Sequence, residues 1–328
     1  MEERLTGAGG EILAHVANGA ATVTLNRPNA LNALTYGMLV ALRDWLDQWE
    51  NDASVRMVVL RGAGPKAFCA GGDIRALYAH IKSGGHDHHL FFEVEYALDH
   101  RIHTYPKTIV AVMDGIVMGG GMGISQGARV RLVGDRTKMA MPETAIGLFP
   151  DVGGSYFLSR APGKLGLYLA LVGPTIGAAD AIYCGLADVY VGAQESPQGE
   201  LERLRPAIDR HFAHESVDDV VESLRSENDP QYREWAERTV EALSRRSPTL
   251  LAVTLEQLRR GAKLTPAECF RMELGLIHAC FEQGDMQEGI RALIIEKDNQ
   301  PRWKPAGATE PFFRPRWEAS RHPLASLG

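Results

Sequence analysis

The chain has 328 residues, of which 45% are hydrophobic and 23% are charged. These fractions are typical of globular proteins and exclude a disordered or fibrous protein, and the length fits one large α/β core with an appended region. The formal net charge of -6, without a long basic run, gives no electrostatic basis for binding nucleic acid or an anionic membrane. A small-molecule partner is therefore expected.

The cysteines and the apolar runs further limit which kinds of protein this chain can be. The four cysteines are scattered without CxxC spacing, which indicates neither a zinc site nor a disulfide framework and fits a reducing, cytoplasmic compartment. No run approaches the roughly 18 apolar residues that a membrane-spanning helix needs. Residues 1–4 are acidic rather than signal-like, so we expect the mature protein to begin near Met1.

The chain opens with paired strands. Residues 12–16 and 21–25 are rich in strand-forming residues, and Asn18-Gly19 between them is the short-range signal of a hairpin. In residues 35–49 leucines recur at helical spacing, with Thr35 as the expected N-cap. The opening therefore predicts a hairpin followed by an amphipathic helix.

A second strand and glycine turn follow this helix. Residues 57–60 form a short apolar run that predicts a strand buried on both faces. Residues 108–113 predict another strand, which leads to the glycine cluster at 119–121 and then to a helix. The repetition of strand, glycine turn and helix predicts βαβ-like units.

The sequence pattern changes beyond about residue 201. Charged segments at 217–224 and 232–245 predict helices, with few strand signals near them. The tail at 301–328 contains five prolines, which limit regular structure and predict a strap that lies over the body.

Two glycine segments can present backbone amides to a ligand. Gly71-Gly72 follows a strand and precedes a helix expected to start near Ile74, and Gly119-Gly120-Gly121 repeats this arrangement. Amides at a helix start point outward and can bind a developing oxyanion, so two such turns can surround one carbonyl oxygen. The alternative is that each pair of glycines only makes a tight turn.

Two carboxylates stand in the otherwise apolar stretch of residues 141–154. Glu143 and Asp151 are eight residues apart, and burial would raise their pKa values and suit them to acid or base chemistry. The alternative for Glu143 is a helix start, where a carboxylate favours the helix dipole. The alternative for Asp151 is a turn or cap residue after Pro150.

Two other signals carry less weight. The cluster of residues 86–89, His-Asp-His-His, has metal-binding residue types but follows Ser83-Gly84-Gly85, which indicates an exposed loop. The chain has no Gly-x-Ser-x-Gly segment, so no serine is mounted on a strand-to-helix turn. Hydrolysis by this chain would have to use carboxylates.

Three motifs, in this order and spacing, resemble the crotonase, or enoyl-CoA hydratase/isomerase, superfamily. They are Phe-Cys-Ala-Gly-Gly-Asp at 68–73, Met-Gly-Gly-Gly at 118–121 and Pro-Glu-Thr-Ala-Ile-Gly at 142–147. The resemblance covers roughly residues 12–191 and implies a crotonase-like α/β fold of repeated ββα units. It also implies a coenzyme A thioester substrate and an oxyanion hole built by the amides of Gly72 and Gly120.

The same resemblance divides the chain in two. It implies an acyl-CoA-binding core at residues 1–200, and the helical region with its proline-containing tail fills residues 201–328.

The surroundings of these turns indicate the subgroup. Hydratases of the superfamily carry a catalytic glutamate where this chain has Gly123, and glycine cannot supply a general acid–base worth about 10²–10⁴-fold. The unbroken run at 143–154 is similar to the 3-hydroxyisobutyryl-CoA hydrolase subgroup, with Asp151 where most hydratases have glycine. Short motifs at 163–166, 247–249, 296–298 and 301–305 continue the resemblance.

Glu95, in residues 91–96, matches the family's substrate-contacting glutamate. Its alternative is an exposed charge on a helix. The resemblance implies that Glu95, Gly120, Glu143 and Asp151 contact the substrate, and that Glu95 orients its 3-hydroxyl.

The resemblance therefore implies hydrolysis of a short branched 3-hydroxyacyl-CoA, with 3-hydroxyisobutyryl-CoA of valine breakdown as the expected substrate. Glu143 is expected to act as nucleophile or as general base, and Asp151 to assist proton transfer or hold water. No metal or redox cofactor is implied, because coenzyme A enters as part of the substrate. A hydratase or dienoyl-CoA isomerase of the same fold, and a non-catalytic acyl-CoA-binding relative, stay open as alternatives, as does a homo-oligomer.

Overall fold

The computed structural model describes residues 2–85, 89–193 and 198–328 of the chain. The described residues form two compact units, each assembled from stretches that are separate in sequence. The first unit takes its residues from 1–73, 86–140 and 175–199, and the second from 74–85, 141–174 and 200–328. The predicted division into residues 1–200 and 201–328 follows chain order, whereas contacts group the chain into these interleaved units.

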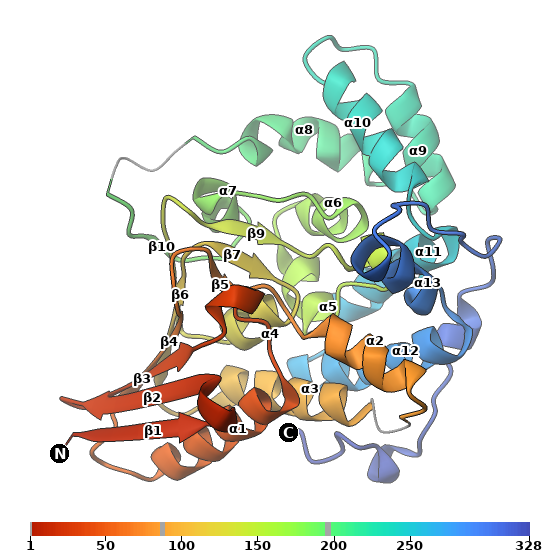
Figure 1. Cartoon of the computed structure of the whole chain (residues 1–328). Coiled ribbons are helices and arrows are strands. Elements are labelled where there is room, and N and C mark those ends of the chain that lie inside the picture. Colours follow the sequence, from red (N-terminus) through yellow and green to blue (C-terminus); the bar gives the residue numbers. More distant parts are fainter. Residues whose placement is uncertain (1, 86–88, 194–197) are drawn as a thin grey trace. The chain divides into compact units, whose positions relative to one another are not determined.

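Two sheets form the centre of the first unit (Figure 1). The larger has the order β1-β2-β3-β4-β6-β8-β10, and its strands are Glu3–Gly7, Ile12–Ala17, Ala20–Leu25, Met57–Gly62, Thr108–Met113, Val130–Val133 and Val189–Tyr190. The smaller has the order β5-β7-β9, with strands Ala67–Cys69, Ile116–Met118 and Lys138–Ala140. Strands β1 to β3 pair antiparallel and the other pairs are parallel.

The expected repetition of ββα units is visible in this order. The pairs β4/β5, β6/β7 and β8/β9 each send their first strand to the larger sheet and their second to the smaller one. Each pair is followed by a helix: α2 (Ile74–Lys82), α4 (Gly120–Gln126) and the 3₁₀ turn η3 (Glu143–Ile146). The three strand-to-helix junctions include Gly72, Gly120 and Glu143, so the repeat places the candidate residues at equivalent points of the chain.

The predicted hairpin is confirmed. Ala17 pairs with Ala20 across a two-residue loop, and Asn18 and Gly19 have φ angles of +53° and +84°. Positive φ at both loop residues is the geometry that matches the twist of an antiparallel pair, and asparagine and glycine adopt it at low cost. The turn residues thus set the register of β2 against β3.

The predicted helix is α1, Tyr36–Glu50, and Thr35 caps it by accepting a hydrogen bond from the Met38 amide at 3.3 Å. The helix packs against α3, His89–Thr104. Arg101 of α3 pairs with Glu50 of α1 at 2.8 Å, which ties the ends of the two helices together.

Strand β4 differs from its prediction in one respect. Val58 and Leu60 are buried, but Val59 is only half-buried and Arg61 is exposed, so the expectation of burial on both faces is wrong. Arg61 donates to the hydroxyl of its cross-strand neighbour Thr24 at 3.1 Å, and a face that carries these two polar side chains needs access to water.

Asn32 holds the segment between β4 and β5. Its side-chain amide donates to the carbonyls of Ala63 and Ala67 at 3.0 and 2.8 Å, and its oxygen accepts from the Arg27 amide at 3.0 Å. Asn32 is fully buried and has a φ of +57°, which asparagine tolerates better than most residues. This side chain therefore connects the backbone at Arg27 to the segment that leads into β5.

We expect Asn32→Ala to lower the free energy of unfolding by about 1–3 kcal/mol for each carbonyl left without a donor. Chemical denaturation with a two-state fit measures the loss. The control is Asn51→Ala, at the exposed C-cap of α1, which should change the free energy of unfolding little. A loss at Asn32 no larger than at Asn51 would show that these buried bonds contribute nothing to stability.

The second unit is mostly helical. The predicted helices at 217–224 and 232–245 are confirmed as α9, Val217–Arg225, and α10, Arg233–Ser244. The other helices are α2, Ile74–Lys82, α5, Gly154–Phe157, α6, Leu165–Val172, α8, Leu201–His211, α11, Pro248–Gly261, α12, Pro266–Gln283, and α13, Met286–Ile290 (Figure 1).

The tail of the second unit lies along its helices, as a strap. Trp303 donates from its indole nitrogen to the Arg245 carbonyl after α10, and the Gly307 amide donates to Thr249 of α11, both at 2.9 Å. Arg271 of α12 donates to the Leu327 carbonyl at 2.8 Å. The only regular structure described in residues 301–328 is two short 3₁₀ turns, Glu310–Phe313 and Ala319–Arg321, as the prolines predict.

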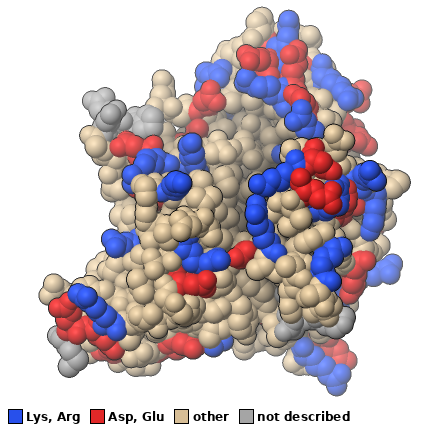
Figure 2. Space-filling view, in the orientation of Figure 1, with Lys and Arg blue, Asp and Glu red and all other residues tan. Residues whose placement is uncertain are grey.

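The surface shows both signs of charge. On the face drawn in Figure 2, lysine and arginine lie interspersed with aspartate and glutamate, and uncharged residues separate the groups. Among the described helices, none is long and apolar enough to cross a bilayer.

Candidate active site

The first glycine turn presents the amide of Gly72. Leu34 pairs with Gly72 in an isolated parallel bridge, in which the Leu34 amide donates to the Gly71 carbonyl at 2.8 Å and its carbonyl accepts from the Asp73 amide at 2.9 Å. Leu34 thus binds the residues on both sides of Gly72, and the Gly72 amide points to the opposite side of the segment. Gly71 has a φ of +99°, which requires glycine.

The second glycine turn starts α4. Gly119 has φ +48° and ψ −123°, and the first amide of the helix belongs to Gly120. The first amides of a helix have no partner inside it. Among the described residues, neither the Gly72 nor the Gly120 amide donates to a backbone carbonyl outside regular structure. Both are therefore available to a ligand.

These two turns meet at Gly120. A Cβ built on Gly120 would lie 3.4 Å from the Gly72 nitrogen and 2.3 Å from Oε1 of Glu95. The structure therefore brings together Gly72, Gly120 and Glu95, three of the five predicted site residues. A Cβ at position 120 would overlap the Glu95 carboxylate in its present place, so a side chain there requires this carboxylate or the turn to move.

Glu95 lies on α3 and is only 2% exposed, so its interpretation as an exposed charge on a helix is wrong. Asp99, one turn further along the same helix, is fully buried as well. Burial raises the pKa of the neighbouring Cys69 thiol to about 12, and the charges of Glu95 and Asp99 add to the shift. The first unit thus contains a buried acidic pair at i and i+4, a spacing that is visible in the sequence although no local pattern marks the two residues as buried.

Glu143 is the first residue of η3, Glu143–Ile146, and is 7% exposed. The alternative that Pro142-Glu143 opens a helix describes the backbone, because Glu143 begins one short 3₁₀ turn. Gly147 ends this turn with a φ of +68°, and a Cβ there would lie 2.8 Å from the backbone of Asp285. The close approach of Asp285 leaves the Glu143 turn little room to move.

Asp151 is 5% exposed and lies in a tight turn, where its carbonyl accepts from the Gly154 amide at 2.7 Å. The next two residues, Val152 and Gly153, have φ angles of +51° and +88°. A left-handed conformation costs a residue with a side chain about 1–2 kcal/mol, and a β-branched valine is a marked outlier there. The turn interpretation is correct for the backbone, and strain of this kind is typical of functional sites.

Glu143 and Asp151 both belong to the second unit, whereas Gly72, Gly120 and Glu95 belong to the first. The predicted residues thus form two sets, one of backbone amides with a carboxylate and one of two buried carboxylates.

Other family-like motifs have structural roles in the second unit. Ser247 caps α11 by accepting from the Leu250 amide at 3.3 Å and donates to Asp285 at 2.6 Å. Gly163 precedes α6 with a φ of +58°. These residues fix helix starts, which explains their place in the pattern without assigning them to the chemistry.

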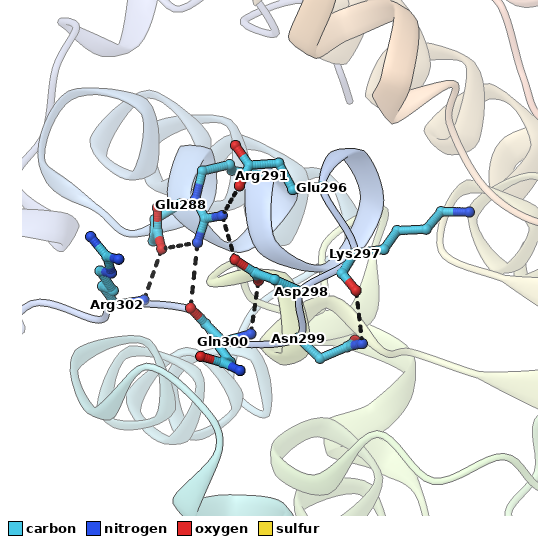
Figure 3. Close-up of polar contacts among 8 residues, drawn as sticks. All are labelled: Glu288, Arg291, Glu296, Lys297, Asp298, Asn299, Gln300 and Arg302. Atoms are coloured by element: carbon cyan, nitrogen blue, oxygen red, sulfur yellow. Dashed lines mark hydrogen bonds and ion pairs between the residues drawn. The ribbon is translucent and has the colours of Figure 1, made fainter.

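The Glu296-Lys297-Asp298 motif surrounds Arg291 of the π-helical turn η5, Arg291–Ile295 (Figure 3). Arg291 pairs with Glu288 and Asp298 at 2.7 Å each and also with Glu296. The Arg291 guanidinium lowers the pKa of Glu288 to about 2, so this ion pair persists well into acid. Figure 3 shows the Lys297 side chain pointing away from the cluster.

Most of the histidine cluster singled out in the sequence lies outside the described residues. His86, Asp87 and His88 lie outside the described residues, and His89 is the first residue of α3. Within the described ranges, no group of three or more His, Cys, Asp or Glu side chains is placed to hold a metal ion.

A model of the enoyl-CoA hydratase/isomerase family matches residues 20–198 and 192–311. The chain belongs to this family, the crotonases. A zebrafish (Danio rerio) protein named 3-hydroxyisobutyryl-CoA hydrolase, mitochondrial, is 40% identical over 93% of this chain and 88% of its own length. The human protein of the same name is 36% identical over 93% and 87%.

Solved crotonase structures confirm the predicted fold. A protein described as a carnitinyl-CoA dehydratase from Mycobacterium thermoresistibile is 42% identical, with a TM-score of 0.87 over 93% of this chain and 96% of that chain. A protein described as an enoyl-CoA hydratase from Rhodobacter sphaeroides is 39% identical, with a TM-score of 0.85 over 97% and 96%. The chain is therefore a crotonase-family enzyme with a C-terminal helical region.

We expect Gly120→Ala to lower acyl-CoA turnover about 10²–10³-fold, the loss typical of one oxyanion-hole donor. The added Cβ forces the Glu95 carboxylate or the turn to move. The control is Gly177→Ala at the N-cap of α7, Ala178–Tyr183, where a Cβ meets no described atom within 4 Å and the rate should stay at the wild-type value. Wild-type turnover by Gly120→Ala would remove this turn from the site.

Proposed function

We propose that this crotonase hydrolyses a short branched 3-hydroxyacyl-CoA, with 3-hydroxyisobutyryl-CoA as its substrate in valine breakdown. The observation that carries the proposal is the pair of buried carboxylates, Glu143 and Asp151, in an unbroken run that the hydrolase subgroup shares. Relatives named as 3-hydroxyisobutyryl-CoA hydrolases at about 40% identity support it.

The amides of Gly72 and Gly120 would bind the thioester carbonyl oxygen as it gains negative charge. Amides that are already oriented pay no reorganisation cost when the tetrahedral intermediate forms, which is why such donors are effective. Glu95, beside Gly120, would accept a hydrogen bond from the 3-hydroxyl of the substrate and so orient the acyl group.

Glu143 would act in one of two ways. As a nucleophile it attacks the carbonyl carbon, the C–S bond breaks, the coenzyme A thiolate takes up a proton, and water then hydrolyses the mixed anhydride. As a general base it removes a proton from the water that attacks the same carbon. Asp151 would hold that water or transfer the proton to the sulfur, and both routes yield one free acid and one thiol.

Hydration is the second candidate, because the two solved structures described above carry the names dehydratase and hydratase. Against it stands Gly123 in α4, which has no side chain to move a proton. The two reactions differ in product, since only hydrolysis releases free coenzyme A.

We expect the protein to release free thiol from 3-hydroxyisobutyryl-CoA and to hydrate crotonyl-CoA slowly or not at all. A thiol reagent measures the first reaction, and the ultraviolet absorbance of the enoyl thioester measures the second, on one protein preparation. Rapid loss of crotonyl absorbance without thiol release would contradict the hydrolase proposal and favour hydration.

We expect Glu143→Gln to lower kcat for thiol release at least about 10²–10⁴-fold, because glutamine has similar volume but cannot serve as base or nucleophile. Substrate binding, measured by calorimetry, should persist. The control is Glu237→Gln, an exposed glutamate of α10, which should retain wild-type kcat. A Glu143→Gln protein with half of the wild-type rate would reduce Glu143 to a residue that starts a helix.

A further inference from the structure

The turn that carries Asp151 is held by two buried polar side chains from distant parts of the second unit. Glu273 of α12 accepts the Gly153 amide at 2.8 Å and the Ser155 amide at 2.9 Å, one on each carboxyl oxygen. Gln257 of α11 donates to the Pro150 carbonyl at 2.6 Å and to the Ser155 hydroxyl at 2.8 Å. The bonds therefore reach the backbone on both sides of Asp151.

These contacts act on the strained part of the turn. Val152 and Gly153 are left-handed, and the Gly153 amide is one of the two that Glu273 accepts. A strained backbone persists only when its surroundings over-determine it. The Glu273 and Gln257 contacts supply that constraint, so Asp151 lies where these two side chains fix its neighbours.

Glu273 is costly to keep at this position. It is fully buried, and burial raises the pKa of its carboxyl group to about 8. Hydrogen bonds from the Ser155 hydroxyl and from the Gly153 and Ser155 amides lower this pKa, but burial has the larger effect. The titratable groups that interact with it are Asp151 on the turn and Cys269 one helical turn earlier on α12. An amide side chain would be a less costly way to cap a short helix, since it carries no charge to desolvate.

We propose that Glu273 is a positioning residue for Asp151, because its carboxyl group accepts the Gly153 and Ser155 amides and keeps the left-handed turn in its active form. The inference rests on the proposed function, which gives Asp151 its role in catalysis. Glu273 acts through the turn and has no part in the bond changes of the reaction.

The test is Glu273→Gln. Glutamine has one carbonyl oxygen, so it accepts one of the two amides and turns an NH₂ group toward the other. We expect kcat for thiol release to fall between about tenfold and about 100-fold, since small misplacements of a catalytic group have effects of this size. KM should stay within about twofold, because Glu273 acts on the turn and does not itself bind the substrate.

Glu227→Gln is the matched control. Glu227 is also a buried carboxylate of the second unit, with a side chain 5% exposed, and it accepts the Asp229 amide at 2.8 Å and pairs with His211 at 2.9 Å. Its replacement should lower the Tm comparably and leave kcat unchanged. Equal kcat values for Glu273→Gln and Glu227→Gln would overturn the proposal, whether both are lowered or neither is.

A milder variant covers the case in which Glu273→Gln does not fold. Ser155→Ala keeps the carboxylate and both amides but removes the hydroxyl that joins Gln257 to Glu273. We expect kcat to fall severalfold at unchanged KM. A rate equal to wild type in folded Ser155→Ala protein, with Glu273→Gln unfolded, would overturn the positioning role.

Failure of the proposed function has a different signature: wild-type protein releases no thiol, or Asp151→Asn retains wild-type kcat. In either case the Asp151 carboxyl carbon is followed by carbon-13 NMR, with its signal assigned from its loss in Asp151→Asn. Because the turn is expected to move in Glu273→Gln, the Asp151 signal should shift relative to wild type at the same pH, whereas Glu227→Gln should leave it unchanged. An unshifted Asp151 signal in folded Glu273→Gln protein would overturn the proposal independently of any activity.

Discussion

The absence of a side chain at Gly120 is the constraint on which the arrangement of Gly72, Gly120 and Glu95 in the first unit depends. Two backbone amides can face one oxygen atom only if nothing stands between them, and the Glu95 carboxylate already fills the space that a Cβ at this position would take. The glycine turn and the bridge between Leu34 and Gly72 bring main chain close to main chain, and α3 brings the Glu95 carboxylate against Gly120.

The two carboxylates of the second unit, Glu143 and Asp151, follow a different principle. The Asp151 turn contains a left-handed valine, and residues of the C-terminal region hold both turns in place. Asp285 closes on the Glu143 turn, while Glu273 and Gln257 hold the turn of Asp151. The helical region is therefore more than an appendage, because it supplies the rigidity that the acidic residues need.

Local features could be predicted from the sequence, and long-range ones could not. The hairpin at Asn18-Gly19, the cap at Thr35 and the glycine turns depend on residues within a few positions of one another. Glu273 lies 120 positions after Gly153, whose amide donates to it, and no local sequence pattern marks Glu273 as a partner of this turn. Burial of Glu95 was also not evident, because a glutamate on a helix is usually exposed. The partial exposure of one face of β4 could not be predicted for a similar reason, since the apolar run before Arg61 is typical of a buried strand.

Gly120 also has a genetic consequence. Every single-base change that alters the amino acid encoded by a glycine codon introduces a residue with a Cβ, and at Gly120 each would meet Glu95 Oε1 at 2.3 Å. The same holds at Gly121, where a Cβ would lie 2.3 Å from the Cys69 carbonyl oxygen. At Gly121 the clash is with backbone, so even alanine or serine should distort the turn, whereas at Gly120 the Glu95 carboxylate must move away from the amide beside it.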